Sequence, residues 1–329
     1  MTDIAAIRAA AARAPRAIRR TPLLAAPALD RLAGRRVLVK AECLQVTGSF
    51  KARGAWAAIS ALAAAGGAPG VLRGVLAYSS GNHAQGVGWA AAAHGLPAVI
   101  LMPSDVPEVK VAATRALGAE VVLYDRATQD REALGARLAA ERGLDLVPPY
   151  DHPEVIAGQG TVGLEIAAQA AEEGVATADV LVPCGGGGLG TGIALALEAE
   201  APGLRVRTAE PEGFDDMARS LAAGEPRRNP RLAGSICDAI LTPEPGRLTF
   251  PILSRLAGPG LAVSDAAALD AVAVAFRHLR IVLEPGGAVA LAAALAHRDA
   301  IAGDTVIVVA SGSNVDPALY ARTIAPAGR

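Results

Sequence analysis

Short apolar segments alternate with alanine-rich segments of helical length along most of this chain. In the first series, predicted strands at 75–78, 98–101 and 120–124 are followed by predicted helices at 82–94, 107–117 and 128–142. A second series has predicted strands at 179–182, 204–209 and 305–309. Its predicted helices are one at 161–173 and one that follows the strand at 179–182 and ends at Glu200. Strands that alternate with helices form parallel sheets covered by helices. The predicted fold class is therefore α/β, with doubly wound parallel sheets that carry helices on both faces.

Two stretches, 66–70 with glycine and proline and 148–150 with two prolines, are the expected crossings between two domains. A chain of 329 residues that is 52% hydrophobic can form more than one core. We therefore expect two domains. The large domain combines residues 1–70 and 152–329, and the small α/β domain comprises residues 71–151.

The composition excludes several classes of partner. A net charge of −1 and 3% aromatic residues argue against nucleic acid, which requires a basic surface and stacking rings. No apolar stretch of about 18 residues is free of Gly, Pro and charge, so we expect no membrane span. The three cysteines are widely spaced, as in proteins of a reducing compartment. We expect a cytoplasmic homodimer that acts on a small molecule.

Lysine is rare in this chain, and one lysine lies in a chemically informative position. Of 31 Lys and Arg residues, only Lys40, Lys51 and Lys110 are lysines. Lys51 lies in Ser-Phe-Lys-Ala-Arg-Gly-Ala, between a predicted strand at 37–43 and a predicted helix. Arginine keeps its proton in proteins, whereas a desolvated lysine can become a free amine that attacks a carbonyl. Lys51 is thus a candidate nucleophile, and a surface lysine at a helix start is the simpler alternative.

Four consecutive glycines, Gly185, Gly186, Gly187 and Gly188, follow the predicted strand at 179–182 and begin a predicted helix. Glycines there contribute no packing, but they let backbone N–H groups converge on an anion at a helix N-terminus. The spacing is neither that of a dinucleotide-binding loop nor that of a Walker loop. A plain glycine-rich turn is the alternative. A reactive lysine together with a phosphate-binding loop suggests pyridoxal phosphate.

A second strand-to-helix turn reads Ser79-Ser80-Gly81-Asn82-His83. Ser79, Ser80 and Gly81, with the N–H groups that begin the helix, form a pocket suited to a substrate carboxylate. Asn82 can hydrogen-bond a phenolic oxygen. His83 is either part of this pocket or an ordinary helix histidine, and the sequence leaves both interpretations open.

These segments together carry a family resemblance. The motifs around Lys51 and Asn82, the four glycines, and Ser311-Gly312-Ser313-Asn314 occur in the order found in fold-type II pyridoxal-phosphate enzymes. The chain resembles the serine/threonine dehydratase and serine racemase branch of that family. The resemblance extends over about residues 20–316.

The resemblance implies a role for each motif. Lys51 would bind the cofactor as a Schiff base, and Phe50 would pack beside its ring. Asn82 would bind the 3′-oxygen, residues 185–188 the phosphate, and Ser311 the pyridine nitrogen. A carboxylate at that nitrogen keeps the ring protonated and strongly electron-withdrawing, whereas a serine favours elimination of a β-leaving group.

Two further residues receive roles from the resemblance. Ser80 would lie on the opposite face of the ring from Lys51, so that the two form an acid–base pair across Cα. Glu284, in Leu-Glu-Pro-Gly-Gly, corresponds to an acidic residue near the ring, and a carboxylate at a helix start is its alternative interpretation. Ser313 departs from the family, which usually has glycine there.

An acidic segment provides a candidate metal site. Glu210, Asp216 and the carbonyl of Phe214 offer the oxygen ligands that Mg²⁺, Mn²⁺ or Ca²⁺ prefers. Racemase-like relatives hold a divalent cation at this spacing. The alternative is a helix N-terminus, where carboxylates are favoured by the helix dipole.

The resemblance implies dehydration of a 3-hydroxy amino acid to a 2-oxo acid and ammonia, with L-threonine or L-serine as the first expectation. A 3-hydroxyaspartate substrate is the close alternative, because Arg131 lies where a racemase-like relative has an arginine able to meet a second carboxylate. A solvated helix arginine is the other interpretation of Arg131. Serine racemisation is a further alternative, since Ser80 would allow reprotonation from the second face.

Overall fold

A computed structural model describes residues 2–65, 73–79, 81–106, 108–125 and 127–325. Its larger sheet has six strands in the order β1-β2-β10-β7-β8-β9. Only the pairing of β1 with β2 is antiparallel, and the other neighbours are parallel. The strands are β1 (Leu23–Ala25), β2 (Arg36–Lys40), β7 (Ala178–Pro183), β8 (Leu204–Pro211), β9 (Leu261–Val263) and β10 (Thr305–Val309).

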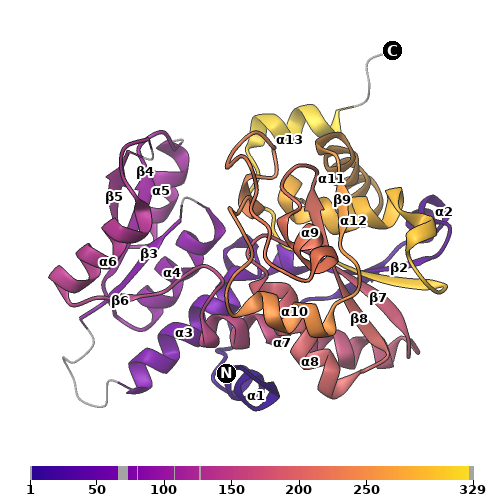
Figure 1. Ribbon diagram of the computed structural model, residues 1–329, viewed down its shortest axis with the longest axis horizontal. Coiled ribbons are helices and arrows are strands. Elements are labelled where there is room, and N and C mark those ends of the chain that lie inside the picture. Colours follow the sequence, from indigo (N-terminus) through magenta and orange to yellow (C-terminus); the bar gives the residue numbers. More distant parts are fainter. Residues whose placement is uncertain (1, 66–72, 80, 107, 126, 326–329) are drawn as a thin grey trace.

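Helices cover both faces of this sheet, because its central strands place apolar residues on both faces. Along β10, Val306 and Val308 belong to one buried cluster, whereas Ile307 and Val309 belong to the other. Successive strand residues point to opposite faces, so both faces must be covered. In Figure 1, α7 and α8 lie on one side of the sheet, and α11 and α12 on the other. The helices are α1 (Ile4–Ala12), α2 (Pro27–Ala33), α7 (Pro153–Glu172), α8 (Gly188–Glu200), α9 (Asp216–Ala223), α10 (Thr249–Leu256), α11 (Asp265–Leu279), α12 (Pro285–Ala296) and α13 (Pro317–Ile324).

The smaller sheet has four parallel strands in the order β5-β4-β3-β6, and it lies beside the larger sheet (Figure 1). Val75 and Ala77 of β3 pack in one cluster with α3 and α4, while Leu76 and Tyr78 pack in another with α6. The strands are β3 (Val75–Tyr78), β4 (Ala98–Pro103), β5 (Glu120–Tyr124) and β6 (Asp145–Leu146). The helices are α3 (Lys51–Ala65), α4 (Asn82–Ala93), α5 (Glu108–Ala116) and α6 (Arg131–Arg142).

These two sheets confirm the predicted doubly wound α/β class. The predicted crossing at 66–70 lies outside the described residues, and the division into residues 1–70 with 152–329 and residues 71–151 stays a prediction. None of the helices in the described ranges is long and apolar enough to cross a membrane. The prediction missed β1, β6 and β9, which have three residues or fewer.

The helix predicted at 161–173 in fact begins at Pro153. Its first half contains Gly158 and Gly160, which lower helix propensity. A Cβ at Gly158 would collide with the carbonyl of Arg53, and one at Gly160 would collide with Ile7. The glycines are therefore required by close helix packing, which a local pattern does not reveal.

Candidate active site

A cavity of about 230 Å³ lies between the two sheets, where the carboxyl ends of β3, β7 and β10 meet. In open parallel sheets this edge is where ligands bind. It is lined by predicted site residues from both series: Phe50, Lys51, Ser79, Gly81, Asn82, His83, Arg131, Gly185, Gly186, Gly187, Gly188, Glu284 and Ser311. Ser80 lies outside the described residues. The predicted metal ligands lie elsewhere.

Lys51 is the first residue of α3, and its side chain is directed into the cavity. Its Nζ donates a hydrogen bond to the carbonyl of Pro149 at 2.6 Å, and it lies 5.2 Å from the centre of the Phe50 ring. Burial lowers the pKa of Lys51 to about 8, although the Glu284 carboxylate opposes this shift. Burial therefore favours the neutral amine form of Lys51, which a nucleophile requires.

A buried ionic cluster fixes the start of α3 behind Lys51. The guanidinium of Arg53 pairs with Glu42 at 2.7 Å and with Glu165 at 2.7 Å, and Glu165 also receives Lys40 at 2.5 Å. Arg53 and Glu42 are both almost completely buried, so each charge depends on its partners. This cluster joins α3 to β2 and α7, and it explains why the motif around Lys51 contains an arginine that does not line the cavity.

The glycine loop supplies a site for an anion. Gly187, the N-cap of α8, has a φ of 90°, which favours glycine. A Cβ at Gly186 would collide with the ring of Tyr150, and a Cβ at Gly188 would also press against Tyr150. The first N–H groups of a helix have no intrahelical carbonyl partners. The N-terminus of α8 therefore offers N–H donors that fit a phosphate, and phosphate binding by residues 185–188 stays a prediction.

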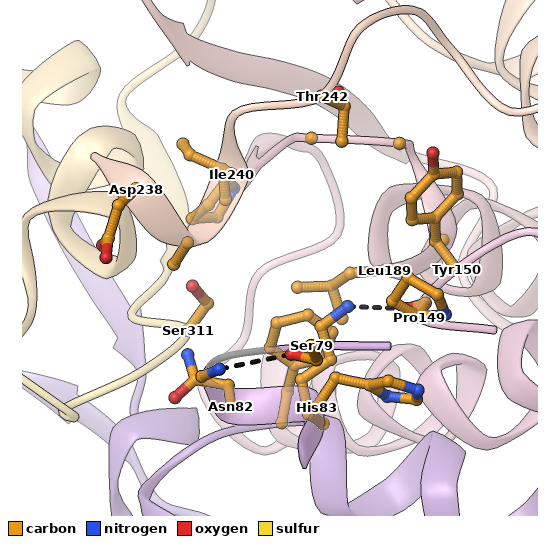
Figure 2. A pocket seen from close by; sticks show the side chains of 18 of the residues that line it. Ser79, Asn82, His83, Pro149, Tyr150, Leu189, Asp238, Ile240, Thr242 and Ser311 are labelled. Atoms are coloured by element: carbon orange, nitrogen blue, oxygen red, sulfur yellow. Dashed lines mark hydrogen bonds between the residues drawn. The ribbon is translucent and has the colours of Figure 1, made fainter. Parts of the chain in front are cut away.

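Hydrogen bonds join side chains from distant segments on one side of the cavity. Asn82 Nδ2 donates to Glu284 Oε1 at 2.6 Å, and Asn82 Oδ1 accepts from Asn314 Nδ2 at 2.6 Å. A Cβ at Gly312 would collide with Glu284. Burial raises the pKa of Glu284 to about 7, while the bond from Asn82 limits the rise. We call Asn82, Glu284, Ser311 and Asn314 the ring end of the cavity; Figure 2 shows Asn82 and Ser311 side by side there.

Ser313, the departure from the family motif, holds the loop before Lys51. Its hydroxyl lies 3.0 Å from the carbonyls of both Cys43 and Gly48, and so donates to one of them at a time. Gly48 has a φ of 75°, and Asn314 donates to the neighbouring carbonyl of Thr47 at 2.9 Å. Ser313 therefore adds a hydrogen bond between the 311–314 segment and the loop that precedes Lys51.

Ser79 and His83 lie on the cavity wall beneath Pro149 in Figure 2. The hydroxyl of Ser79 accepts from the N–H of Gly81 at 3.2 Å. His83 Nε2 lies 2.8 Å from the carbonyl of Val147, which can only accept, so Nε2 carries the proton. Burial, aided by the Lys51 charge, lowers the pKa of His83 to about 3, and the ring is neutral. His83 is thus both a fixed helix histidine and a cavity residue whose Nδ1 has no partner among the described groups.

Arg131 also lies in the cavity lining, at the first position of α6. Its guanidinium lies 5.3 Å from the centre of the Tyr78 ring, and its only ion pair in the described part of the chain is with Glu132, at 3.9 Å. Burial raises the pKa of Tyr150 to about 12, and the Arg131 charge counteracts part of that rise. We call Tyr78, Arg131 and Tyr150 the open end of the cavity; Tyr150 lies across from Asn82 in Figure 2.

Sequence reasoning missed several lining residues. Tyr150 lies in the segment 148–150, which we interpreted only as a crossing between domains. Tyr78 lies in the predicted strand at 75–78, to which we assigned no role in the site. Lys110 donates to Asp238 at 3.0 Å across the two sheets, where α5 approaches a short turn of 3₁₀ helix. The rarity of lysine was a usable signal for Lys110. The two tyrosines had none, because their position depends on the tertiary fold.

The predicted metal ligands form a helix start. Glu210 accepts from the N–H groups of Met217 and Ala218 at 2.9 and 2.8 Å, and Asp216 accepts from Asn229 Nδ2 at 2.6 Å. Burial raises the pKa of Glu210 well above its usual value and that of Asp216 to about 7. In the described ranges, no group of three or more His, Cys, Asp or Glu side chains could hold a metal. The hydrogen bonds of Glu210 are those of the helix-start interpretation, and a cation at this position stays a prediction.

Comparisons with known proteins identify the family of this chain. A family model described as "Pyridoxal-phosphate dependent enzyme" matches residues 14–312. L-threo-3-hydroxyaspartate ammonia-lyase from Pseudomonas sp is 41% identical over 303 residues, which cover 92% of each chain. Serine racemase from Schizosaccharomyces pombe is 37% identical over 92% of this chain and 91% of its own. The solved threonine deaminase from T.th. is 44% identical, with a TM-score of 0.87, over 95% of this chain and 99% of its own. The chain therefore belongs to the fold-type II pyridoxal-phosphate dependent enzymes.

Proposed function

We propose that this carbon–oxygen lyase dehydrates 3-hydroxyaspartate to its 2-oxo acid and ammonia. The observation that carries the proposal is the position of Arg131, which lines the same cavity as Lys51 and is partly exposed there. A guanidinium in a partly buried site favours a carboxylate, which L-threonine and L-serine lack on their side chains. The ammonia-lyase relative from Pseudomonas sp acts on a substrate of this class. The proposal reverses the order of substrates expected from the sequence, in which L-threonine or L-serine came first and 3-hydroxyaspartate was the alternative.

The cavity residues fit pyridoxal phosphate. The N–H groups of residues 185–188 would hold its phosphate, Asn82 and Ser311 would contact its ring, and Lys51 would bind it covalently. When bound, the cofactor withdraws electrons from Cα of the substrate. The collisions that Cβ atoms would make at Gly186 and Gly312 show that the backbone here must lie close to its neighbours.

The residues of the chain then supply the proton transfers and the orientation. Ser79 and the N–H groups at the start of α4 bind the α-carboxylate, and Arg131 binds the second carboxylate. Lys51, with a pKa of about 8, takes the Cα proton. The β-hydroxyl leaves as water, with a proton that balances the one taken from Cα, and a second water molecule hydrolyses the released enamine to the 2-oxo acid and ammonia. A role for Ser80 on the second face stays a prediction.

Dehydration of L-threonine or L-serine is the second candidate. It is favoured by the likeness to a threonine deaminase over 95% of this chain. The test is to measure kcat/KM for L-serine, L-threonine and both 3-hydroxyaspartate diastereomers, while D-serine is monitored. A higher kcat/KM for L-threonine than for either diastereomer would reject our proposal, and D-serine as the main product would indicate a racemase.

We also propose a divalent cation beside Glu210 and Asp216. Asp216 Oδ2 is buried and has no hydrogen-bond partner among the described residues. Two buried carboxylates with raised pKa values require either a proton or a cation nearby, since an unpaired buried charge is costly. The carbonyl of Phe214 would complete the set. Cytoplasmic location and homodimer formation stay predictions from sequence.

A further inference from the structure

We propose that Tyr78 is a positioning residue that holds Arg131 against the cavity, and thereby sets the preference for a substrate with a second carboxylate. This inference rests on the proposed function and deepens it. Tyr78 is the last residue of β3, directly before Ser79 of the carboxylate pocket. Both Tyr78 and Arg131 line the cavity, and the Arg131 Cζ atom lies 5.3 Å from the centre of the Tyr78 ring.

The Tyr78 ring is itself firmly held. It packs with Leu76 and Leu101 in the apolar cluster under α6. A Cβ at Gly135, one turn along α6 from Arg131, would lie 3.3 Å from Tyr78 Cδ1. Glycine at this position lets α6 approach the ring closely. The ring is therefore a rigid surface, fixed by the same helix whose first residue it supports.

Arg131 can serve a ligand because its one ion pair among the described residues is weak. Glu132 lies 3.9 Å away, and the side chains of Arg131 and Glu132 are 41% and 67% exposed. An exposed pair at that distance contributes little and does not fix a long side chain. The face of an aromatic ring attracts a guanidinium while leaving its N–H groups available. The ring can thus orient the guanidinium without consuming the donors that a carboxylate needs.

Two substitutions separate the ring face from other contributions of Tyr78. Tyr78→Leu keeps apolar volume but removes the aromatic face. We expect the ratio of kcat/KM for 3-hydroxyaspartate to that for L-threonine to fall by about 3- to 20-fold, the range of a partly buried cation–π contact. Tyr78→Phe keeps the face and should retain most of the ratio. An unchanged ratio in Tyr78→Leu would overturn the inference.

A matched control and a double substitution exclude a merely structural effect. Tyr124 lies in the same apolar cluster but does not line the cavity, so Tyr124→Leu should lower stability without shifting the ratio. If Tyr78 acts through Arg131, Tyr78→Leu should have no further effect on the ratio in an Arg131→Gln background. Additive effects of the two substitutions would contradict the inference.

Binding of unreactive acids tests the subsite independently of turnover. Succinate has the carbon skeleton and both carboxylates of the proposed substrate, whereas butyrate replaces one carboxylate by a methyl group. Calorimetry on the holoenzyme should show tighter binding of succinate, and Tyr78→Leu should reduce this difference by a similar factor of about 3- to 20-fold. If the enzyme fails to dehydrate 3-hydroxyaspartate but shows this dependence, the proposed function fails and the role of Tyr78 stands. Equal binding of succinate and butyrate by the wild type would reject the role of Tyr78.

Discussion

The two ends of the cavity are built differently. At the ring end, Asn82 donates to Glu284 and accepts from Asn314, each at 2.6 Å, so segments from three parts of the chain fix one amide. At the open end, Arg131 contacts a ring face and one exposed carboxylate at 3.9 Å. The ring end is thus preorganised before any ligand binds, while the open end retains a positive charge that a ligand can neutralise.

This difference predicts two kinds of effect. Substitutions near Lys51 and at the ring end should change turnover of every substrate alike, since they alter the common chemistry. Substitutions at the open end should change the ratio between substrates, since they alter only the contacts to the side chain. The predictions below test this division, from the largest expected effect to the smallest.

Replacement of Lys51 should have the largest effect. Arginine cannot lose its proton or form an imine, so Lys51→Arg should lower turnover of all substrates by about 10⁴-fold or more. Borohydride reduction followed by peptide mass spectrometry should attach the cofactor to Lys51 in the wild type. A reducible covalent cofactor that persists in Lys51→Ala would refute this assignment.

Replacement of Arg131 should separate the substrates. Loss of a charged hydrogen bond to a carboxylate corresponds to about 1.5–3 kcal/mol, or about 10- to 150-fold. Arg131→Gln should lower kcat/KM for 3-hydroxyaspartate by that factor and should change kcat/KM for L-threonine much less. Equal losses on both substrates would show that the open end does not select between them.

Removal of the proposed cation should reduce stability by a smaller amount. A chelator should lower the Tm by about 5 °C, and added Mg²⁺, Mn²⁺ or Ca²⁺ should restore it, because a ligand that binds only the folded state stabilises it. Asp216→Asn should abolish the response. Asp215→Asn is the matched control, since Asp215 is the N-cap residue of α9 and pairs with Arg219 at 3.4 Å. A wild type that is indifferent to chelator leaves Glu210 and Asp216 as a helix start only.

The smallest expected effect is a pH dependence at the ring end. Burial raises the pKa of Glu284 to about 7, so the folded protein favours the protonated carboxyl group. The protonated group contributes fully to the free energy of unfolding below the usual carboxyl pKa, and this contribution is lost as pH rises through about 7. Glu284→Gln removes this titration. Between about pH 5 and 8, the wild type should therefore lose Tm relative to Glu284→Gln. A constant difference across that range would show that Glu284 does not titrate there.

The fold was largely predictable because its strands are apolar and its turns carry glycine. The sequence placed β3, β5 and β10 at their observed bounds. It missed β6 and β9 because two or three residues carry no measurable alternation. It misplaced the start of α7 because glycines required by contacts with α1 and α3 resemble a break in a helix.

The candidate site was predictable where a residue type carries its own chemistry. A rare lysine, four consecutive glycines and an Asn-His pair marked the cavity from sequence alone. Tyr78 and Tyr150 escaped notice because an aromatic residue in a strand or a turn usually packs in a core. Their relation to Arg131 arises only when α6 folds back over β3.

The most direct test of the proposed substrate preference is a competition between two substrates. Wild-type holoenzyme would receive equal, subsaturating concentrations of L-threo-3-hydroxyaspartate and L-threonine, and the two 2-oxo acids would be quantified at early times. The ratio of products then equals the ratio of kcat/KM values. We expect the dicarboxylic 2-oxo acid to exceed the product of L-threonine by at least about 10-fold. An excess of the L-threonine product would contradict the proposed preference.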